Sequence, residues 1–292
     1  MLQECIEALN IKPGGTYVDV TFGGGGHSRE IMKHLGKDGR LIAFDQDADA
    51  QQNIIADNRF EFVDQNFRYL KNFCRLHGAM SVDGILADLG VSSYQFDQAD
   101  RGFSIRFDAE LDMRMNQSSE LTAKQVVNTY TEAELHRIFG IYGEIQNAKS
   151  LARTVATARL NGPLNTIADL KNAIAGLIPR GKENKYLAQV FQALRIEVNQ
   201  ELEALKDFLT QTAEVLGTGG RLVVMSYHSL EDRLVKNFIV KGKFSGEVEK
   251  DFYGNDQKPL EAVSRGAITA TEEEIQENNR ARSAKLRIAV KR

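Results

Sequence analysis

A run of four glycines places the strongest constraint on how this chain folds. The segment VDVTFGGGGHS carries Asp19 on an apolar strand, passes through glycines 23–26 and continues into a helix that starts near His27. Glycine is needed where the backbone adopts a positive φ or approaches a ligand, and the first turn of a helix offers free N–H groups. The segment predicts a ligand-binding strand–turn–helix unit, with a purely structural turn as the alternative.

The spacing of these glycines disfavours a dinucleotide site. The dinucleotide fingerprint needs a third glycine three residues after the second. In the two registers of the glycine run, that position holds Ser28 or Arg29. An oxidoreductase that binds nicotinamide is therefore the weaker interpretation. A turn that meets an amino-acid carboxylate, an ammonium group and a ribose, without a pyrophosphate, tolerates both residues.

From Met1 to about Lys71, short apolar strands alternate with helical stretches, which predicts βαβ units and a parallel sheet. Helices are expected from near His27, from near Ala48, over SLEDRLVKNFIV, and over 198–216, where three glycines close the helix. The closing glycines are Gly217, Gly219 and Gly220. The expected strands are residues 16–22, 40–45, 60–65, 83–89 and 220–228, with KLRIAVKR as a final edge strand.

The fourth and fifth strands are far apart in the sequence, which indicates an insertion between them. Stretches such as LTAKQVVNTY, EAELHRIFGIYG and NAKSLARTVATARL show apolar residues at helical spacing. We therefore expect a core domain of residues 1–96 and 198–292. Residues 97–197 are expected to form a helical subdomain over the carboxyl ends of the sheet that recognises the substrate.

Polar residues follow several predicted strands and form the candidate site. Asp45 lies about twenty residues after the glycines, where a carboxylate can accept both hydrogens of a ribose diol in either a nicotinamide dinucleotide or S-adenosylmethionine. Asp64 and Phe67 follow the third strand, near where an adenine ring would lie, and Phe67 is expected to pack against that ring. The alternatives are a helix cap for Asp64 and a core aromatic for Phe67. The residues after the fourth strand predict the reaction site in the crevice beside the sheet; they are Asp88, Ser92, Ser93 and Gln95.

Composition narrows the classes of protein further. The net charge of −3 disfavours a protein that holds nucleic acid by charge alone, although residues 280–292 carry six basic and no acidic side chains. No stretch approaches the apolar length of a membrane span, so a cytoplasmic protein with no membrane partner is expected. Cys5 and Cys74 have no Cys or His partners at metal-ligand spacing. We therefore expect both cysteines to be small buried residues that form neither a disulfide nor a metal site.

Six segments, in order, resemble the bacterial small-subunit ribosomal RNA cytosine-N4 methyltransferase family of the MraW type. They are VDVTFGGGGHS, ADLGVSSYQFDQADRGFS, LDMRM, FQALRIEVNQEL, GGRLVVMSYHSLEDRLVK and NNRARSAKLRIAV. The resemblance covers nearly the whole chain. One departure is at the start, where the family usually has a short segment with His and Pro before the first helix, whereas this chain begins at Met1 inside that helix. It implies an α/β class I methyltransferase fold, Rossmann-like, with a seven-stranded sheet and an inserted helical subdomain.

The resemblance also implies a cofactor and a substrate. The cofactor is S-adenosyl-L-methionine, and the acceptor is the exocyclic N4 amine of a cytidine in the decoding centre of 16S ribosomal RNA, within the small ribosomal subunit. Carried over by position, the cofactor contacts fall on Gly25, Gly26, His27, Asp45, Phe67, Asp88 and Gln95.

The exocyclic amine of cytosine is a poor nucleophile, so positioning and oriented hydrogen-bond acceptors should dominate catalysis. Asp88 is the first candidate for this role, with Ser226 and His228 next. The residues that could hold phosphates and wall a flipped base are Arg101, Phe103, Arg106, Arg114 and Arg195.

Three questions stay open at this level. The acceptor could be a small molecule or a protein, the chain could bind RNA without catalysis, and it could act as a monomer or a homodimer.

Overall fold

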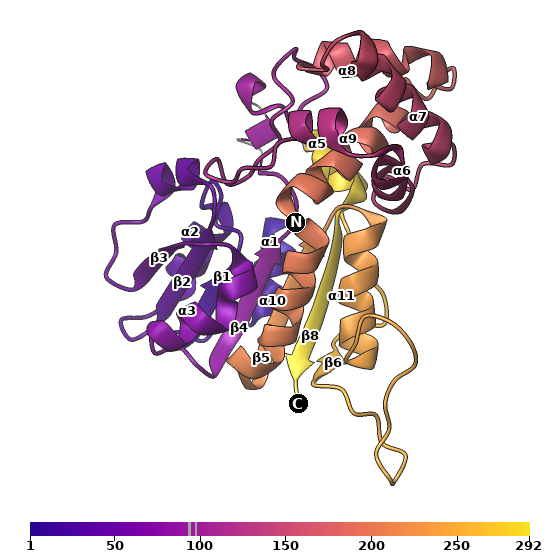
Figure 1. Ribbon diagram of the computed structural model, residues 1–292. Helices are drawn as coiled ribbons and strands as arrows, with labels where there is room; N and C mark the ends of the chain where they lie inside the picture. The colour runs from indigo at the N-terminus through magenta and orange to yellow at the C-terminus, as the bar shows by residue number, and fades with distance from the viewer. Residues whose placement is uncertain (93–94, 97) are drawn as a thin grey trace. The chain divides into compact units, whose positions relative to one another are not determined.

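The computed structural model describes residues 1–92, 95–96 and 98–292 (Figure 1). The chain divides into two units. The first comprises Met1–Gly90 and Leu202–Arg292, and the second comprises Val91–Glu201. The second unit therefore begins earlier and ends later than the insertion expected at residues 97–197. Ser93, which the sequence places in the crevice after the fourth strand, lies outside the described residues.

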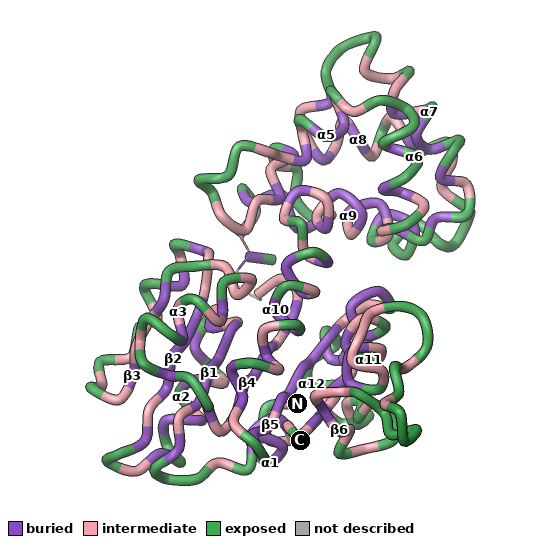
Figure 2. Tube along the Cα trace, turned by 60° about the horizontal axis from the view of Figure 1, so that its bottom comes forward, coloured by how far each residue is buried: buried purple, intermediate pink, exposed green. Residues whose placement is uncertain are grey.

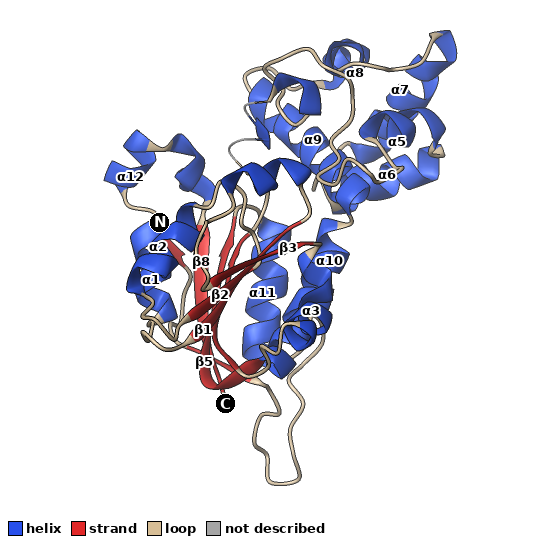
Figure 3. Cartoon of the chain, turned by 90° about the vertical axis from the view of Figure 1, so that its left-hand side faces the viewer, coloured by secondary structure: helices blue, strands red, loops and turns tan. Residues whose placement is uncertain are grey.

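A mainly parallel sheet organises the first unit (Figures 1 and 3). Its strands lie in the order β3-β2-β1-β4-β5-β8-β6, and the two-residue β7 also pairs with β8. This is the strand order of class I methyltransferases, so the predicted fold class is confirmed. The strands are β1 (Thr16–Asp19), β2 (Arg40–Asp45), β3 (Phe60–Asp64), β4 (Val82–Asp88), β5 (Leu216–Ser226), β6 (Leu260–Ala262), β7 (Ile268–Thr269) and β8 (Lys285–Lys291).

Helices cover both faces of this sheet (Figure 3). On one face, α1 (Leu2–Leu9) and α2 (Gly26–His34) pack against a core that includes Tyr17 and Leu41. On the other face, Phe208 and Phe238 lie in a core built with three helices, α3 (Leu70–Leu76), α10 (Glu201–Val215) and α11 (Ser229–Lys241). The remaining helices of this unit are α12 (Glu272–Glu277), η1 (Ala48–Asn53), η2 (Phe67–Tyr69) and η6 (Asn279–Ser283).

Burial follows the strands closely, and most residues of β2 and β4 are buried (Figure 2). A parallel sheet covered on both faces requires such nearly continuous apolar runs. Cys5 and Cys74 are buried, as predicted.

Three expectations about the first unit are wrong, and the first two concern η1 and β8. The helix expected from Ala48 is only the 3-10 helix η1, because just one residue of that polar segment is buried and an amphipathic face is lacking. The final strand β8 is not an edge strand, since it pairs with β5 on one side and with β6 and β7 on the other. The three-residue β6 is too short for a periodic signal to reveal.

The glycines after residue 216 belong to β5 and do not close a helix, which corrects a third expectation. Val82 pairs with Leu216, but Gly84 pairs with Arg221, so the pairing register shifts over the intervening residues of β5. Gly219 has a φ of 80°, and a Cβ on Gly220 would approach the Val82 carbonyl oxygen to 2.8 Å. Glycine therefore permits the irregular backbone here.

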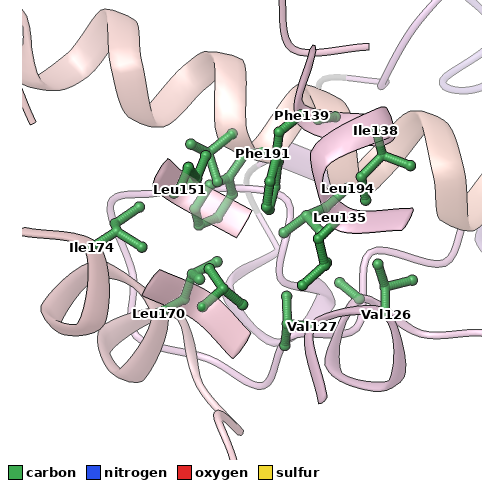
Figure 4. Packing of buried hydrophobic residues seen from close by; sticks show 14 of the residues in the cluster. Val126, Val127, Leu135, Ile138, Phe139, Leu151, Leu170, Ile174, Phe191 and Leu194 are labelled. Carbon is green, nitrogen blue, oxygen red and sulfur yellow. The ribbon is translucent and has the colours of Figure 1, made fainter. Parts of the chain in front are cut away.

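The second unit is helical and has its own core (Figure 4). Thr122, Thr131 and Thr166 cap α5, α6 and α8, each as part of a capping box. Within the described residues of the whole chain, no helix is long and apolar enough to cross a membrane. The elements of the unit are η3 (Ala99–Arg101), α5 (Ala123–Thr129), α6 (Glu132–Ile141), α7 (Ala148–Ala158), η4 (Arg159–Asn161), α8 (Ile167–Ile174), η5 (Ala175–Leu177) and α9 (Glu183–Asn199).

Candidate active site

The carboxyl ends of the parallel strands meet at one edge of the sheet in the first unit (Figure 3). Asp19 ends β1, Asp45 ends β2 and Asp88 ends β4, while Ser226 ends the neighbouring strand β5. Open α/β sheets bind their ligands at this edge. The strand order thus gathers three carboxylates around the glycine turn that follows β1.

The glycine turn needs glycine at two positions and leaves open space at two others. Gly23 and Gly25 have φ values of 48° and 75°, a backbone conformation that other residues rarely adopt. A Cβ on Gly25 would also approach Arg29 Nη1 to 2.9 Å. A Cβ on Gly24 or Gly26 would meet nothing within 4 Å. The turn therefore exposes backbone that a ligand can approach closely.

Asp45 supports the glycine turn from the next strand. Its Oδ2 accepts a hydrogen bond from Gly23 N at 2.7 Å, and its Oδ1 accepts one from Asp47 N at 2.9 Å. Burial raises the pKa of Asp45 to about 6, although these hydrogen bonds act in the opposite direction. Each carboxylate oxygen can accept a further hydrogen bond, so the side chain can support the turn and bind a diol at the same time.

Asp19 is a site residue that the sequence interpretation passed over. Its side chain is buried, and it accepts hydrogen bonds from Ser28 Oγ at 2.7 Å and from Thr21 N at 3.1 Å. Burial raises the pKa of this carboxyl above its ordinary value, while the charge of His27 opposes the shift. An aspartate that ends an apolar strand just before a glycine run was the available signal. Asp19 ties the turn to the first helical residues of α2.

Asp88 lies between two side chains of the site. Tyr227 Oη donates to Asp88 Oδ1 at 2.8 Å, and His27 Nδ1 lies 3.8 Å from Asp88 Oδ2. Burial raises the pKa of Asp88, whereas His27 and the hydrogen bond from Tyr227 lower it. Tyr227 was missed by the sequence interpretation, which singled out the residues on either side of it.

His27 carries an unsatisfied ring nitrogen. Its Nε2 is buried and has no hydrogen-bond partner among the residues that the structure describes. An unpaired buried polar atom is costly, and at the start of α2 it is suited to a ligand group. This observation supports His27 as a binding residue.

Ser226 and His228 have structural contacts in the first unit. Ser226 is buried, and its Oγ donates to the Lys285 carbonyl oxygen at 3.4 Å. His228 is the N-cap of α11, where its Nδ1 accepts from Glu231 N at 3.5 Å. Its buried Nε2 lies 3.1 Å from Glu231 Oε1 but makes no hydrogen bond within the described residues. A catalytic role for either residue stays a prediction.

Phe67 lies after β3, at the same edge of the sheet. Its ring meets that of Phe208 edge to face, with the centroids 5.5 Å apart, so it is partly a core aromatic. Phe67 begins the short helix η2, and Asn66, not Asp64, caps this helix by accepting a hydrogen bond from Arg68 N. The proposed adenine wall at Phe67 stays a prediction.

Gln95 belongs to the second unit. Gln95 is buried, and its Oε1 accepts from Ser92 N at 3.1 Å. Its cofactor contact therefore stays a prediction.

Three of the predicted RNA-binding residues have structural partners within the second unit. Arg101 is buried and donates to the carbonyl oxygens of Arg114 and Met115. Phe103 lies in the core of the unit, and the Arg101 guanidinium is 5.8 Å from its ring centroid. Arg195 is paired with Glu201, with its Nε 2.7 Å from Oε1.

Arg114 and Arg106 differ in their surroundings. Arg114 binds both oxygens of Asp112, at 2.9 and 2.7 Å, and also donates to two carbonyl oxygens. Burial by itself would raise the pKa of Asp112, but the hydrogen bonds from Arg114 lower it below its ordinary value. Arg106 is exposed, and within the described part of the chain its guanidinium makes no hydrogen bond or ion pair. Arg106 is therefore the cation of this set that is freest to meet a phosphate.

Comparison with known proteins places this chain among methylases. The pattern of the MraW methylase family matches residues 1–292. Ribosomal RNA small subunit methyltransferase H of Christiangramia forsetii is 57% identical over 291 residues, covering 100% of this chain and 96% of that protein. The protein of the same name from Cytophaga hutchinsonii is 58% identical over 292 residues, covering 99% and 97%.

Among solved structures, an rRNA methylase from Streptococcus thermophilus is 13% identical with a TM-score of 0.38. The comparison covers 99% of this chain and 93% of that one.

Proposed function

The chain belongs to the MraW methylase family, and on this premise we propose that it transfers a methyl group from S-adenosylmethionine to a small-subunit ribosomal RNA. The acceptor is the exocyclic N4 amine of a cytidine in the decoding centre of 16S ribosomal RNA. The observation that carries the proposal is the full-length identity of more than half with proteins named ribosomal RNA small subunit methyltransferase H. The carboxylates and the glycine turn at one sheet edge supply a matching site.

The residues at the glycine turn fit the cofactor. The unpaired Nε2 of His27 and the open space at Gly24 and Gly26 can receive a polar ligand. Asp45 would hold the ribose diol and Phe67 would wall the adenine. When bound, S-adenosylmethionine supplies an electrophilic methyl group on a positively charged sulfur. The proposed set is Gly25, Gly26, His27, Asp45, Phe67, Asp88 and Gln95.

Asp88 would orient the nucleophile. The lone pair of the cytosine amine is delocalised into the ring, so an acceptor that binds an amine hydrogen helps to aim it. Asp88 ends its strand at the ligand edge and has one oxygen held by Tyr227. Ser226 and His228 are the second candidates for holding the base. Because a paired base cannot reach a protein pocket, the target cytidine has to be single-stranded or flipped.

The second unit is proposed to recognise the RNA. Its exposed Arg106 can meet a phosphate directly. Four other predicted residues would contribute indirectly, by stabilising the parts of the second unit that contact RNA. They are Arg101, Phe103, Arg114 and Arg195. The substrate would be the RNA within the small subunit, which locates the protein in the cytoplasm. Sedimentation of the purified protein would distinguish a monomer from a homodimer.

The decisive experiment measures transfer of labelled methyl from S-adenosylmethionine to small subunits from cells that lack this protein. Nucleoside analysis should then find the label in N4-methylcytidine. Label in another nucleoside would contradict the acceptor. Donor binding without transfer to RNA would favour a small-molecule or protein acceptor, and RNA binding without donor binding would favour a non-catalytic protein.

Replacing Arg106 with alanine should weaken RNA binding without affecting the cofactor. Losing one phosphate contact to single-stranded RNA should reduce the slope of log K against log salt by about 0.7. The salt dependence of binding, measured by fluorescence anisotropy, checks this. Arg153→Ala is the matched control, because Arg153 is also exposed in the second unit. An unchanged slope for Arg106→Ala would remove Arg106 from the interface.

Cofactor binding should weaken as the pH falls through about 6, the value to which burial raises the pKa of Asp45. The ionised carboxylate accepts the ribose hydrogens best, so protonation below this pH removes an acceptor while affinity recovers above it. Calorimetric titration with S-adenosylhomocysteine between about pH 5 and pH 8, a range that brackets the pKa of Asp45 and lies above ordinary carboxyl values, checks the direction. Affinity that is constant through pH 6 would contradict the proposed contact.

A further inference from the structure

We propose that Tyr227 is a positioning residue for the methyl transfer, whose hydroxyl holds Asp88 so that the second carboxylate oxygen faces the substrate. The inference rests on the proposed function and deepens it. It concerns how Asp88 is held rather than which cofactor or RNA is bound.

The contacts of Asp88 leave one oxygen for a ligand. Its backbone N donates to Thr21 Oγ1 at 2.7 Å, and Tyr227 Oη donates to its Oδ1 at 2.8 Å. Its Oδ2 lies 3.8 Å from His27 Nδ1, which is beyond a good hydrogen bond. The side chain keeps 28% of its surface exposed. Tyr227 thus holds one carboxylate oxygen, and the side chain as a whole stays partly accessible.

Tyr227 is itself held firmly. Its backbone N donates to Glu231 Oε2 at 3.0 Å, and Glu231 is buried within the first turn of α11. Its ring lies beside Gly90, just after β4, where an added Cβ would sit 3.6 Å from the ring. Burial raises the pKa of the Tyr227 phenol well above its ordinary value, so the hydroxyl remains a donor at neutral pH.

This hydrogen bond has two consequences for the reaction. It restricts rotation of the carboxylate, and the acceptor must be well placed because small misplacements cost much of the rate. It also stabilises the ionised form of Asp88 against the burial that favours the neutral form. The other titratable groups that interact with Asp88 include His27, Asp19, Cys5 and the amino group of Met1, and Tyr227→Phe replaces none of them.

Tyr227→Phe should lower kcat by about 10- to 100-fold, the effect of losing one hydrogen bond to a charged group. The KM for S-adenosylmethionine should change much less, because the other proposed cofactor contacts are left intact. The acidic limb of the pH–rate profile should move to higher pH, because Asp88 without its donor binds a proton more readily. Carbon NMR of labelled aspartate in the cofactor-free protein should show the same rise in the pKa of Asp88.

Tyr186→Phe is the matched control. It removes a phenol that is hydrogen-bonded to Asn147 Oδ1 at 3.0 Å in the second unit. It should leave the pH limb and the Asp88 signal unchanged.

The outcomes separate this inference from the proposed function. Wild-type protein that does not methylate small subunits contradicts the function. Active wild type, together with Tyr227→Phe that keeps its kcat or its pH limb, overturns the positioning role. If Tyr227→Phe does not fold, 3-fluorotyrosine at position 227 keeps the ring and supplies a stronger donor. The acidic limb should then move to lower pH, and no movement would overturn the inference.

Discussion

Asp45→Asn should weaken cofactor binding by about 100-fold or more, because hydrogen bonds to a charged group contribute about 1.5 to 3 kcal/mol each. The carboxylate accepts from the backbone N–H groups of Gly23 and Asp47. An asparagine has one oxygen, so its amide nitrogen would face one of these donors. The substitution therefore disturbs the glycine turn and removes an acceptor for the ribose.

Isothermal titration calorimetry with S-adenosylhomocysteine would measure this loss. Asp38→Asn is the matched control, since it removes the same charge from an exposed residue just before β2. Its affinity should equal that of the wild type. An Asp45→Asn protein that binds within a few-fold of wild type would show that the ribose lies elsewhere.

Phe139→Ala should destabilise the second unit by about 3 to 5 kcal/mol, the usual cost of removing a buried phenylalanine ring. Phe139 is fully buried and packs among Leu135, Leu151 and Phe191 in the core of that unit (Figure 4). A loss of this size is a large fraction of the stability of a domain. Methylation of RNA should fall sharply, while cofactor binding should fall much less, because all proposed cofactor contacts except Gln95 belong to the first unit.

Hydrogen exchange would locate the loosening in residues 91–201, and calorimetry would report cofactor binding. Leu160→Ala is the control, because Leu160 is an apolar residue of the same unit with 82% of its surface exposed. Leu160→Ala should change neither the hydrogen exchange of residues 91–201 nor the affinity for the cofactor. Equal losses of RNA methylation and cofactor affinity in Phe139→Ala would contradict a division of labour between the two units.

The structure changes how the predicted arginines should be tested. Arg114 neutralises Asp112 and supports two carbonyl groups, so Arg114→Ala would disturb the loop as well as any RNA contact. Loss of methylation in that variant would not identify a phosphate contact. Arg106, which is exposed, gives the cleaner test of RNA recognition.

Local sequence was sufficient for the parts of the fold that depend on local chemistry. The glycines at positions 23 and 25 adopt the positive φ that their residue type permits, and α2 follows them as predicted. The strand over 40–45 occurs with its predicted bounds. Alternating strands and helices sufficed to predict a parallel sheet. Since carboxyl ends of parallel strands meet at one edge, the grouping of Asp45 with Asp88 followed.

Tertiary structure decided the contacts between residues that are far apart in the chain. Tyr227 meets Asp88 across 139 positions, and neither residue carries a local signal for its partner. The position of β8 inside the sheet depends on the short β6, and the burial of Phe103 depends on how the helices of the second unit pack. Periodicity reports which face of an element is apolar, whereas register and packing determine which side chains meet.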